Sequence, residues 1–97
     1  MIQFEWDENK NKTNQEKHSV DFKEAVTVFF DDYGIVIPDY SHSQNEDRYV
    51  LIGFSNLARL LVVCYCYRKT DSGDETIRII SSRKATKNEA LNYLEAR

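Results

Sequence analysis

Four short segments rich in Val, Ile, Leu and Tyr follow one another between residues 34 and 82 of this chain of 97 residues. Residues of these types favour β-strands. The polar connections between the segments are too short to carry a crossover between parallel strands, so the spacing predicts an antiparallel meander. The strands are predicted at Gly34–Pro38, Tyr49–Phe54, Arg59–Tyr67 and Thr76–Ser82, with a polar loop at 39–48, a tight turn at Ser55-Asn56 and a hairpin loop at Thr70–Asp74.

The first third of the chain has a different pattern. Residues 2–6 alternate apolar and polar side chains, which predicts a half-buried strand. The polar stretch 8–17 contains many helix formers and neither Gly nor Pro, so it predicts a short surface helix. In 22–30 the apolar residues recur at helical spacing, which predicts a helix whose aromatic face packs on the sheet.

Two stretches resemble capping boxes, in which the residue before a helix and the residue three positions later bind each other's backbone N–H groups. In 21–24, Asp21 would accept hydrogen bonds from the backbone and Glu24 would reach back. The second box, 86–89, would open a helix that ends near Glu95, with Leu91 and Leu94 facing the core.

Together these elements predict one α+β domain over residues 1–97, with a small antiparallel sheet, two N-terminal helices and a C-terminal helix, all helices on one face. A hydrophobic fraction of 41% is enough for a single modest core. The longest apolar run, Leu60–Tyr67, falls far short of the ~20 residues that span a bilayer. The first residues also lack the pattern of a signal peptide, so a soluble cytoplasmic protein is expected.

The cysteines and histidines do not form a metal-binding pattern. Cys64 and Cys66 lie two apart in one predicted strand, so their side chains share a face in a geometry that disfavours a disulfide. His18 and His42 are far apart in the sequence, whereas zinc sites use closely spaced sets of ligands. Neither a metal nor another cofactor is expected.

Charge is distributed unevenly along the chain. Residues 1–58 carry five Lys or Arg and eleven Asp or Glu, whereas residues 59–87 carry seven Lys or Arg and three Asp or Glu. This asymmetry permits a basic surface that binds a polyanion on an otherwise acidic body. The alternative is an ordinary solvated strand face, which also carries Lys and Arg.

The polar segment 81–86 lies between the last predicted strand and the last helix. Arg83 and Lys84, beside the exposed N–H groups of a helix start, would form a phosphate site. Alternatively, they only cover the strand end while Thr86 caps the helix. Similarly, His18 is interpretable as a capping or packing residue at a helix end, and Arg48 as a member of a surface ion pair.

Four blocks of the sequence resemble the BrnT toxin family in order and spacing, and together they cover nearly the whole chain. They comprise Phe4 to Lys10, Lys17-His18 to Ala25, Asp47-Arg48-Tyr49 to Gly53, and Arg78 to Glu89. The chain departs from the family pattern at three positions. Ser19 stands where the family usually has Gly, Ser82 where it commonly has Ala, and Ala90 where it often has Arg.

The resemblance implies a ribonuclease toxin of a type II toxin–antitoxin pair, with a fold similar to that of the RelE-type toxins. It also implies a BrnA-like ribbon-helix-helix antitoxin that binds operator DNA. Toxin and antitoxin would form a two-plus-two assembly that represses its own operon. Exposed sheet edges could dock an antitoxin segment through backbone pairing, and the acidic residues of 1–58 would suit a basic antitoxin surface.

Metal-independent RNA cleavage by the 2′-hydroxyl needs a base, cations for the phosphorane and an acid for the leaving oxygen. Arg83 and Lys84 are the first candidates for charge stabilisation, and Arg48 is a further cation. His18 is the candidate base or acid because imidazole titrates near neutral pH. The predicted RNA-binding residues are Arg78, Thr86, Lys87 and Tyr49, the last of which could stack on a base.

Other side chains are weaker candidates for the chemistry. Glu24 is less suited because the capping box would occupy it, and Glu46 or Asp47 could serve as the base only if the fold brings them near Arg83. Tyr93 could also stack a base or donate a proton, but such aromatic residues are more often structural.

Two alternatives to a growth-arresting nuclease stay open from the sequence. The first is a binding module that holds the antitoxin and helps to repress the operon, with weak or lost nuclease activity; the departures at Ser19, Ser82 and Ala90 motivate it. The second is a toxin on the same fold that targets gyrase. Cleavage of RNA distinguishes the nuclease from both.

Overall fold

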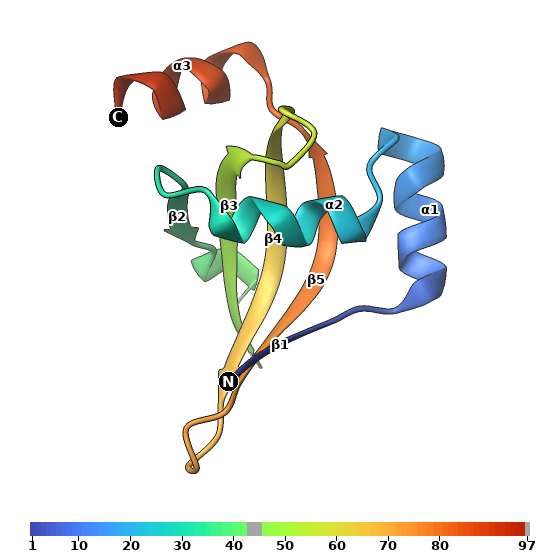
Figure 1. The fold of residues 1–97 in the computed structure, drawn as a ribbon, viewed down its shortest axis with the longest axis vertical. Helices are drawn as coiled ribbons and strands as arrows, with labels where there is room; N and C mark the ends of the chain where they lie inside the picture. The colour runs from blue at the N-terminus through green and yellow to red at the C-terminus, as the bar shows by residue number, and fades with distance from the viewer. Residues whose placement is uncertain (43–45, 97) are drawn as a thin grey trace.

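The structure is a computed structural model that describes residues 1–42 and 46–96. It contains a five-stranded sheet, three α-helices and two short 3-10 helices (Figure 1). The strands are β1 (Ile2–Glu5), β2 (Ile35–Pro38), β3 (Asp47–Phe54), β4 (Leu60–Lys69) and β5 (Glu75–Lys84); the helices are α1 (Glu8–His18), α2 (Phe22–Thr27), η1 (Val28–Phe30), η2 (Tyr40–His42) and α3 (Lys87–Glu95). None of the helices in these residues is long and apolar enough to cross a membrane.

The α+β class and the order of the elements are confirmed, with boundaries that differ from the predicted ones by a few residues at most. The hairpin loop at 70–74 forms as predicted, with the Thr70 N–H donating to the Asp74 carbonyl and Gly73 at a φ of 94°. The turn predicted at Ser55-Asn56 is longer and ends at Arg59, whose carbonyl accepts from the Ser55 N–H. Part of the predicted loop at 39–48, namely 43–45, lies outside the described residues.

The strand order across the sheet is β1-β5-β4-β3-β2. Strands β2 to β5 form the predicted antiparallel meander. The expectation of a wholly antiparallel sheet is wrong for β1, which pairs parallel to β5 between Ile2–Glu5 and Glu75–Arg78. The alternation that identifies a strand does not identify its partner, and α1 and α2 separate β1 from the meander in the sequence.

One face of the sheet packs against α2 and η1. Figure 1 shows α2 crossing in front of the three long strands β3, β4 and β5. The core here combines Phe22, Ala25 and Val28 with apolar side chains of the strands, and burying these residues supplies the main driving force for folding. The strand residues of this core are Leu51, Leu61, Val63, Tyr65, Ile77 and Ile79.

The prediction that all helices cover one face is wrong, because α3 packs on the other. Tyr93 of α3 is 1% exposed and contacts Ile52 and Val62, which alternate with the core residues of the first face. Leu91 and Leu94, predicted to face inward, are 50% and 54% exposed. Tyr93 takes the inward position because its ring packs on Phe54 and its hydroxyl donates to Asp31 Oδ2 at 2.7 Å.

Helix α1 docks without an apolar stripe, and its buried side chains are Asn11 and Asn14. The Asn14 amide acts like a neighbouring strand: it donates to the Ser82 carbonyl at 2.8 Å and accepts from the Ser82 N–H at 3.0 Å. It also donates to the Val20 carbonyl, while Asn11 accepts from the Phe22 N–H. These bonds hold α1 along the part of β5 that β1 does not cover.

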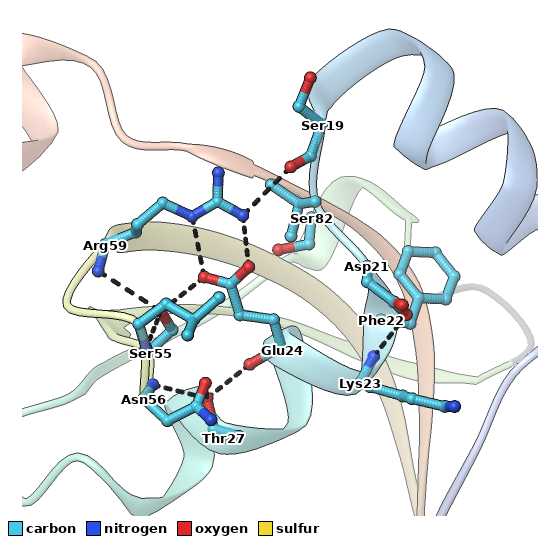
Figure 2. A network of polar contacts seen from close by, with 12 residues as sticks. Ser19, Asp21, Phe22, Lys23, Glu24, Thr27, Ser55, Asn56, Arg59 and Ser82 are labelled. Atoms are coloured by element: carbon cyan, nitrogen blue, oxygen red, sulfur yellow. Dashed lines mark hydrogen bonds and ion pairs between the residues drawn. The ribbon is translucent and has the colours of Figure 1, made fainter.

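The predicted capping box at 21–24 forms only in part. Asp21 caps α2 by accepting from the Lys23 N–H. Glu24 does not reach back to the helix start. The residue is 7% exposed, and its carboxylate is bound instead by Arg59 and by the Ser55 hydroxyl (Figure 2). A buried carboxylate favours the partner that neutralises its charge, and Arg59 does so with two N–H groups.

Replacing Asn14 with Asp tests the polar docking of α1. The Asp side chain keeps the acceptor but loses the amide donor, which leaves the Val20 and Ser82 carbonyls facing a carboxylate. We expect Asn14→Asp to lower the free energy of unfolding by about 2–4 kcal/mol in urea titrations at neutral pH. The control Asn9→Asp makes the same chemical change at an exposed position of α1 and should alter it by less than about 0.5 kcal/mol. Equal effects of both variants would show that Asn14 does not hold the helix.

Candidate functional site

Arginines gather on the sheet face opposite to α2. The core residues of the first face alternate along each strand with side chains that point the other way. Four of the latter are arginines: Arg48 on β3, Arg68 on β4, and Arg78 and Arg83 on β5. We call this set the arginine face.

One row of the arginine face crosses four strands. Arg48 pairs with Cys66, Cys66 with Arg78, and Arg78 with Glu5. The Glu5 carboxylate lies 3.1 Å from Arg78 and 3.9 Å from Arg68, so it links two of the arginines. These ion pairs are partly exposed and contribute little to stability, but they restrict where the guanidinium groups lie.

The Cys66 thiol lies at the middle of this row, beside the side chains of Arg48 and Glu46. Cys66 is 2% exposed, and burial together with the Glu46 carboxylate raises the pKa of its thiol above the usual value. Cys66 is therefore a neutral, buried side chain beneath the charged groups rather than a nucleophile. The structure brings Glu46, one of the possible bases, to the end of the row that holds Arg48.

Arg83 lies on the same face, nearer to α3. Its partner on β4 is Val62, four residues from Cys66, which is roughly 13 Å along the strand. Its Nη1 and Nη2 atoms donate to the two carboxylate oxygens of Glu89 at 2.7 and 2.9 Å. Within the described part of the chain, the edge formed by Nε and the second N–H of Nη2 has no hydrogen-bond partner, and it could bind two further oxygens.

Glu89 also completes the second predicted capping box, which is confirmed. The Thr86 N–H donates to Glu89 Oε1 at 2.8 Å, and the Glu89 N–H donates to Thr86 Oγ1 at 3.2 Å. The hydrogen bonds from Arg83 are the main reason why the pKa of Glu89 falls to about 2. One carboxylate thus fixes both the start of α3 and the orientation of Arg83.

The other predicted site residues lie in different places. Lys84 and Lys87 are exposed on either side of Thr86, whose hydroxyl is engaged in the cap. Tyr49 faces α2 and stacks on Tyr65, with 5.6 Å between the ring centroids. The structure therefore groups Arg48, Arg78 and Arg83 on one face but does not bring Tyr49 to it.

His18 is exposed at the end of α1 and lines a cavity of about 330 Å³ between α1 and β5. We call this cavity the α1 groove. Its walls come from the α1 residues Asn9, Lys10, Thr13, Asn14, Lys17 and His18 and from Ile80 and Ser81 of β5. His18 thus lies near Ser81, two positions before Arg83 on the same strand.

Sequence reasoning did not identify Arg68, Glu5 or the α1 groove. Arg68 lies two residues from Cys66, and Arg83 lies five residues from Arg78. Which of these side chains share a face of the sheet can be read only once the strand register is known. Among residues 1–42 and 46–96, no group of three or more His, Cys, Asp or Glu side chains is placed to hold a metal ion.

Comparison with known proteins identifies the family. A family model described as "Ribonuclease toxin, BrnT, of type II toxin-antitoxin system" matches residues 6–89. This chain belongs to the BrnT family. The crystal structure of the ribonuclease toxin BrnT from Brucella abortus is similar to it, with 25% identity and a TM-score of 0.63 over 90% of this chain and 100% of that chain. No curated protein sequence matches the chain.

Membership of the BrnT family confirms three predictions. The chain is a ribonuclease toxin of a type II toxin–antitoxin system, its fold is that of the BrnT structure, and an antitoxin is its partner. The arginine face of this BrnT toxin therefore belongs to a protein whose substrate is RNA, a polyanion that guanidinium groups bind well.

The Arg83–Glu89 pair makes a pH-dependent contribution to stability. Because the folded pKa of Glu89 is about 2, against an ordinary value of 4.5, its ionised form stabilises the BrnT fold above about pH 5. This stabilisation is lost as the pH falls from about 5 towards 2. We expect Glu89→Gln, which keeps a capping side chain, to cost about 1–2 kcal/mol at pH 7 and progressively less at lower pH.

Urea unfolding followed by circular dichroism between about pH 7 and pH 2.5 measures this difference. Glu95→Gln at the exposed end of α3 is the matched control. Its free energy of unfolding should lie within about 0.5 kcal/mol of the wild-type value at every pH. If the free energies of unfolding of wild type and Glu89→Gln differ by the same amount at every pH in this range, the ionised Glu89 carboxylate is not the source of the stabilisation.

Proposed function

We propose that this toxin is a metal-independent endoribonuclease that cleaves RNA on the arginine face and thereby arrests growth. The observation that carries the proposal is the placement of four arginines on one sheet face, one of which is oriented by Glu89 and keeps a guanidinium edge that no other described residue binds. A single strand of RNA laid across β3, β4 and β5 would meet several of these cations in turn.

In the proposed reaction the 2′-oxygen attacks the adjacent phosphorus and the bond from phosphorus to the 5′-oxygen breaks. The products are a 2′,3′-cyclic phosphate and a 5′-hydroxyl. A base removes the 2′ proton and an acid protonates the departing 5′-oxygen. The phosphorane between these steps carries extra negative charge, which fixed guanidinium groups stabilise more than they stabilise the ground state.

Arg83 is our choice for the phosphorane because its orientation is fixed before substrate binds. The Glu89 carboxylate holds one side of the guanidinium, and the Nε–Nη2 edge matches two phosphate oxygens. Lys84 supplies additional positive charge beside it. Arg48 and Arg78, roughly 13 Å away along the strands, suit more distant phosphates of the same RNA strand.

We assign proton transfer to His18, in keeping with its place beside Ser81 in the α1 groove. Glu46 lies with Arg48 and Cys66, roughly 13 Å along the strands from Arg83, so we do not assign it as the base for the phosphate that Arg83 binds. Thr86 and Lys87 at the start of α3 are proposed to contact RNA next to Arg83. We do not assign Tyr49 a stacking role because it packs against Tyr65 on the opposite face.

Two Arg83 variants test the catalytic assignment. Arg83→Ala removes the cation, whereas Arg83→Lys keeps a charge that can still pair with Glu89 but loses the bidentate edge. With EDTA present, we expect Arg83→Ala to cleave a fluorescent RNA at least about 100-fold more slowly than wild type, and Arg83→Lys to lose most of the activity.

The control Lys69→Ala removes an exposed cation at the end of β4 and should cleave RNA within about twofold of wild type. Thermal unfolding confirms that each variant is folded, and induction in a bacterial host compares growth and total RNA. Wild-type cleavage that disappears with EDTA would contradict metal independence. Arrest of growth with intact RNA would indicate another target such as gyrase.

We propose further that the antitoxin is BrnA-like, with a ribbon-helix-helix DNA-binding fold, and that toxin and antitoxin form a two-plus-two assembly that binds operator DNA. The docking region we assign is the β2 patch, defined as Phe30, Tyr33, Val36 and Ile37. Each of these side chains is at least 47% exposed, and β2 is an outer strand of the described sheet. An added antitoxin strand would pair with β2 and cover the apolar side chains.

A lysine in the β2 patch should weaken antitoxin binding without affecting RNA cleavage. We expect Val36→Lys to raise the Kd for the antitoxin at least about tenfold in titration calorimetry, because the charge opposes burial of the edge. Leu57→Lys, at an equally exposed apolar residue outside the patch, should leave the Kd within about twofold. Wild-type affinity in Val36→Lys would place the antitoxin elsewhere.

A further inference from the structure

We propose that the α1 groove is a phosphate subsite in which Lys10 and Lys17 hold the RNA strand beyond the scissile bond. This inference rests on the proposed function, because it extends the path of the same RNA strand from the arginine face. It assigns a binding role to α1, a helix that lies outside the sheet on which the arginine face is formed.

The groove has a defined shape because its two walls are fixed to each other. The Asn14 amide makes two hydrogen bonds to the Ser82 backbone, so α1 cannot slide along β5. Helix α1 also ends on a capped turn, in which the Ser19 N–H donates to the Gln15 carbonyl at 2.9 Å. Ser19 has a φ of 58°, in the left-handed region that favours glycine at helix ends.

The charge of the groove suits a polyanion. Lys10 and Lys17 lie seven positions apart, about two turns, and therefore project from the same side of α1 with Asn14 between them. Among the described residues that line the groove, none is acidic. Glu8 is held elsewhere, because its carboxylate accepts from Trp6 Nε1 at 3.0 Å and from Asn11 Nδ2 at 3.2 Å.

The groove adjoins the arginine face through a β-bulge in β5. Ile79 pairs with Tyr65 and Ser81 pairs with Cys64, so Ile80 is an extra residue at this point. Both Ile80 and Ser81 line the groove, while Cys64 lies close enough to Arg83 to interact with it electrostatically. A strand of RNA that leaves Arg83 over the edge of β5 thus enters the groove directly.

Helix α1 and β1 divide the outer edge of β5 between them. β1 pairs only with Glu75–Arg78, and α1 flanks the remainder of the strand (Figure 1). A β-strand at this position would present backbone groups to the substrate, whereas α1 presents lysine side chains. Lysine suits a subsite that holds phosphates without reading sequence, because it acts as a point charge.

The test is a double variant, Lys10→Gln/Lys17→Gln, with Lys12→Gln/Lys23→Gln as the matched control. The control removes the same charge from exposed lysines that do not line the groove. Binding is measured by fluorescence anisotropy with a 2′-O-methylated RNA of about 12 nucleotides, which lacks the nucleophile and cannot be cleaved. A DNA of the same sequence is measured in parallel.

We expect the groove variant to bind the RNA about five- to tenfold more weakly than wild type at low salt. The slope of log Kd against log salt should fall by about 1.4, since each single-strand phosphate contact contributes about 0.7. The control variant should match wild type in both its RNA affinity and its salt dependence. With cleavable RNA, the groove variant should raise KM and leave kcat unchanged, because it keeps His18 and Arg83 and removes only the lysines that hold a phosphate beyond the scissile bond.

Equal affinities of the groove and control variants would overturn the subsite, as would a wild type that does not bind RNA. A groove variant that weakens binding of the RNA but not of the DNA would also overturn it, because both strands carry the same phosphates. The failure of the proposed function is a separate result: a wild type that binds RNA through the groove but cleaves no RNA would retain the subsite and contradict the nuclease mechanism. Circular dichroism of both variants establishes that α1 is intact.

Discussion

The arrangement of α2 relative to the turn between β3 and β4 and to the end of α1 depends on one buried carboxylate. Glu24 accepts hydrogen bonds from the Arg59 guanidinium and, at 2.6 Å, from the Ser55 hydroxyl, and the Arg59 Nη2 also donates to the Ser19 carbonyl at 3.1 Å (Figure 2). The hydrogen bonds from Arg59 are the main cause of the lowered pKa of Glu24. This network joins α2, the turn between β3 and β4, and the end of α1. Because a buried charge without its partner is strongly unfavourable, these elements are held in one arrangement.

Two polar side chains that contact β5 each have two functions. Glu89 caps α3 and orients Arg83, and the Asn14 amide replaces a strand partner while it sets the width of the α1 groove. In both cases the group that fixes the backbone also fixes a surface available to RNA. A toxin of 97 residues has a small core. Specific hydrogen bonds therefore fix the positions of its helices, which a larger hydrophobic interface would fix in a larger protein.

The elements that depend on local sequence pattern could be predicted from the sequence, whereas the contacts between distant segments could not. Alternation and capping signals located the strands and helices, including the box at Thr86 and Glu89 that is confirmed. They could not assign β1 to β5, nor show that α3 buries Tyr93 on the second face, because those contacts join distant segments. The arginine face was found only in part for the same reason: Arg68 joins Arg78 through Glu5, a residue more than sixty positions away in the chain.

The strand order bears on how an antitoxin could inhibit the nuclease. The β2 patch lies at one edge of the sheet, whereas Arg83 and the α1 groove lie towards the other, with β3 and β4 between them. An antitoxin segment confined to the β2 patch would therefore bind without covering Arg83. Inhibition at this site requires a second part of the antitoxin to extend across the arginine face. There, acidic side chains of the antitoxin would have to compete with RNA phosphates for the same guanidinium groups. The arginine face and the β2 patch would therefore contact chemically different parts of one partner.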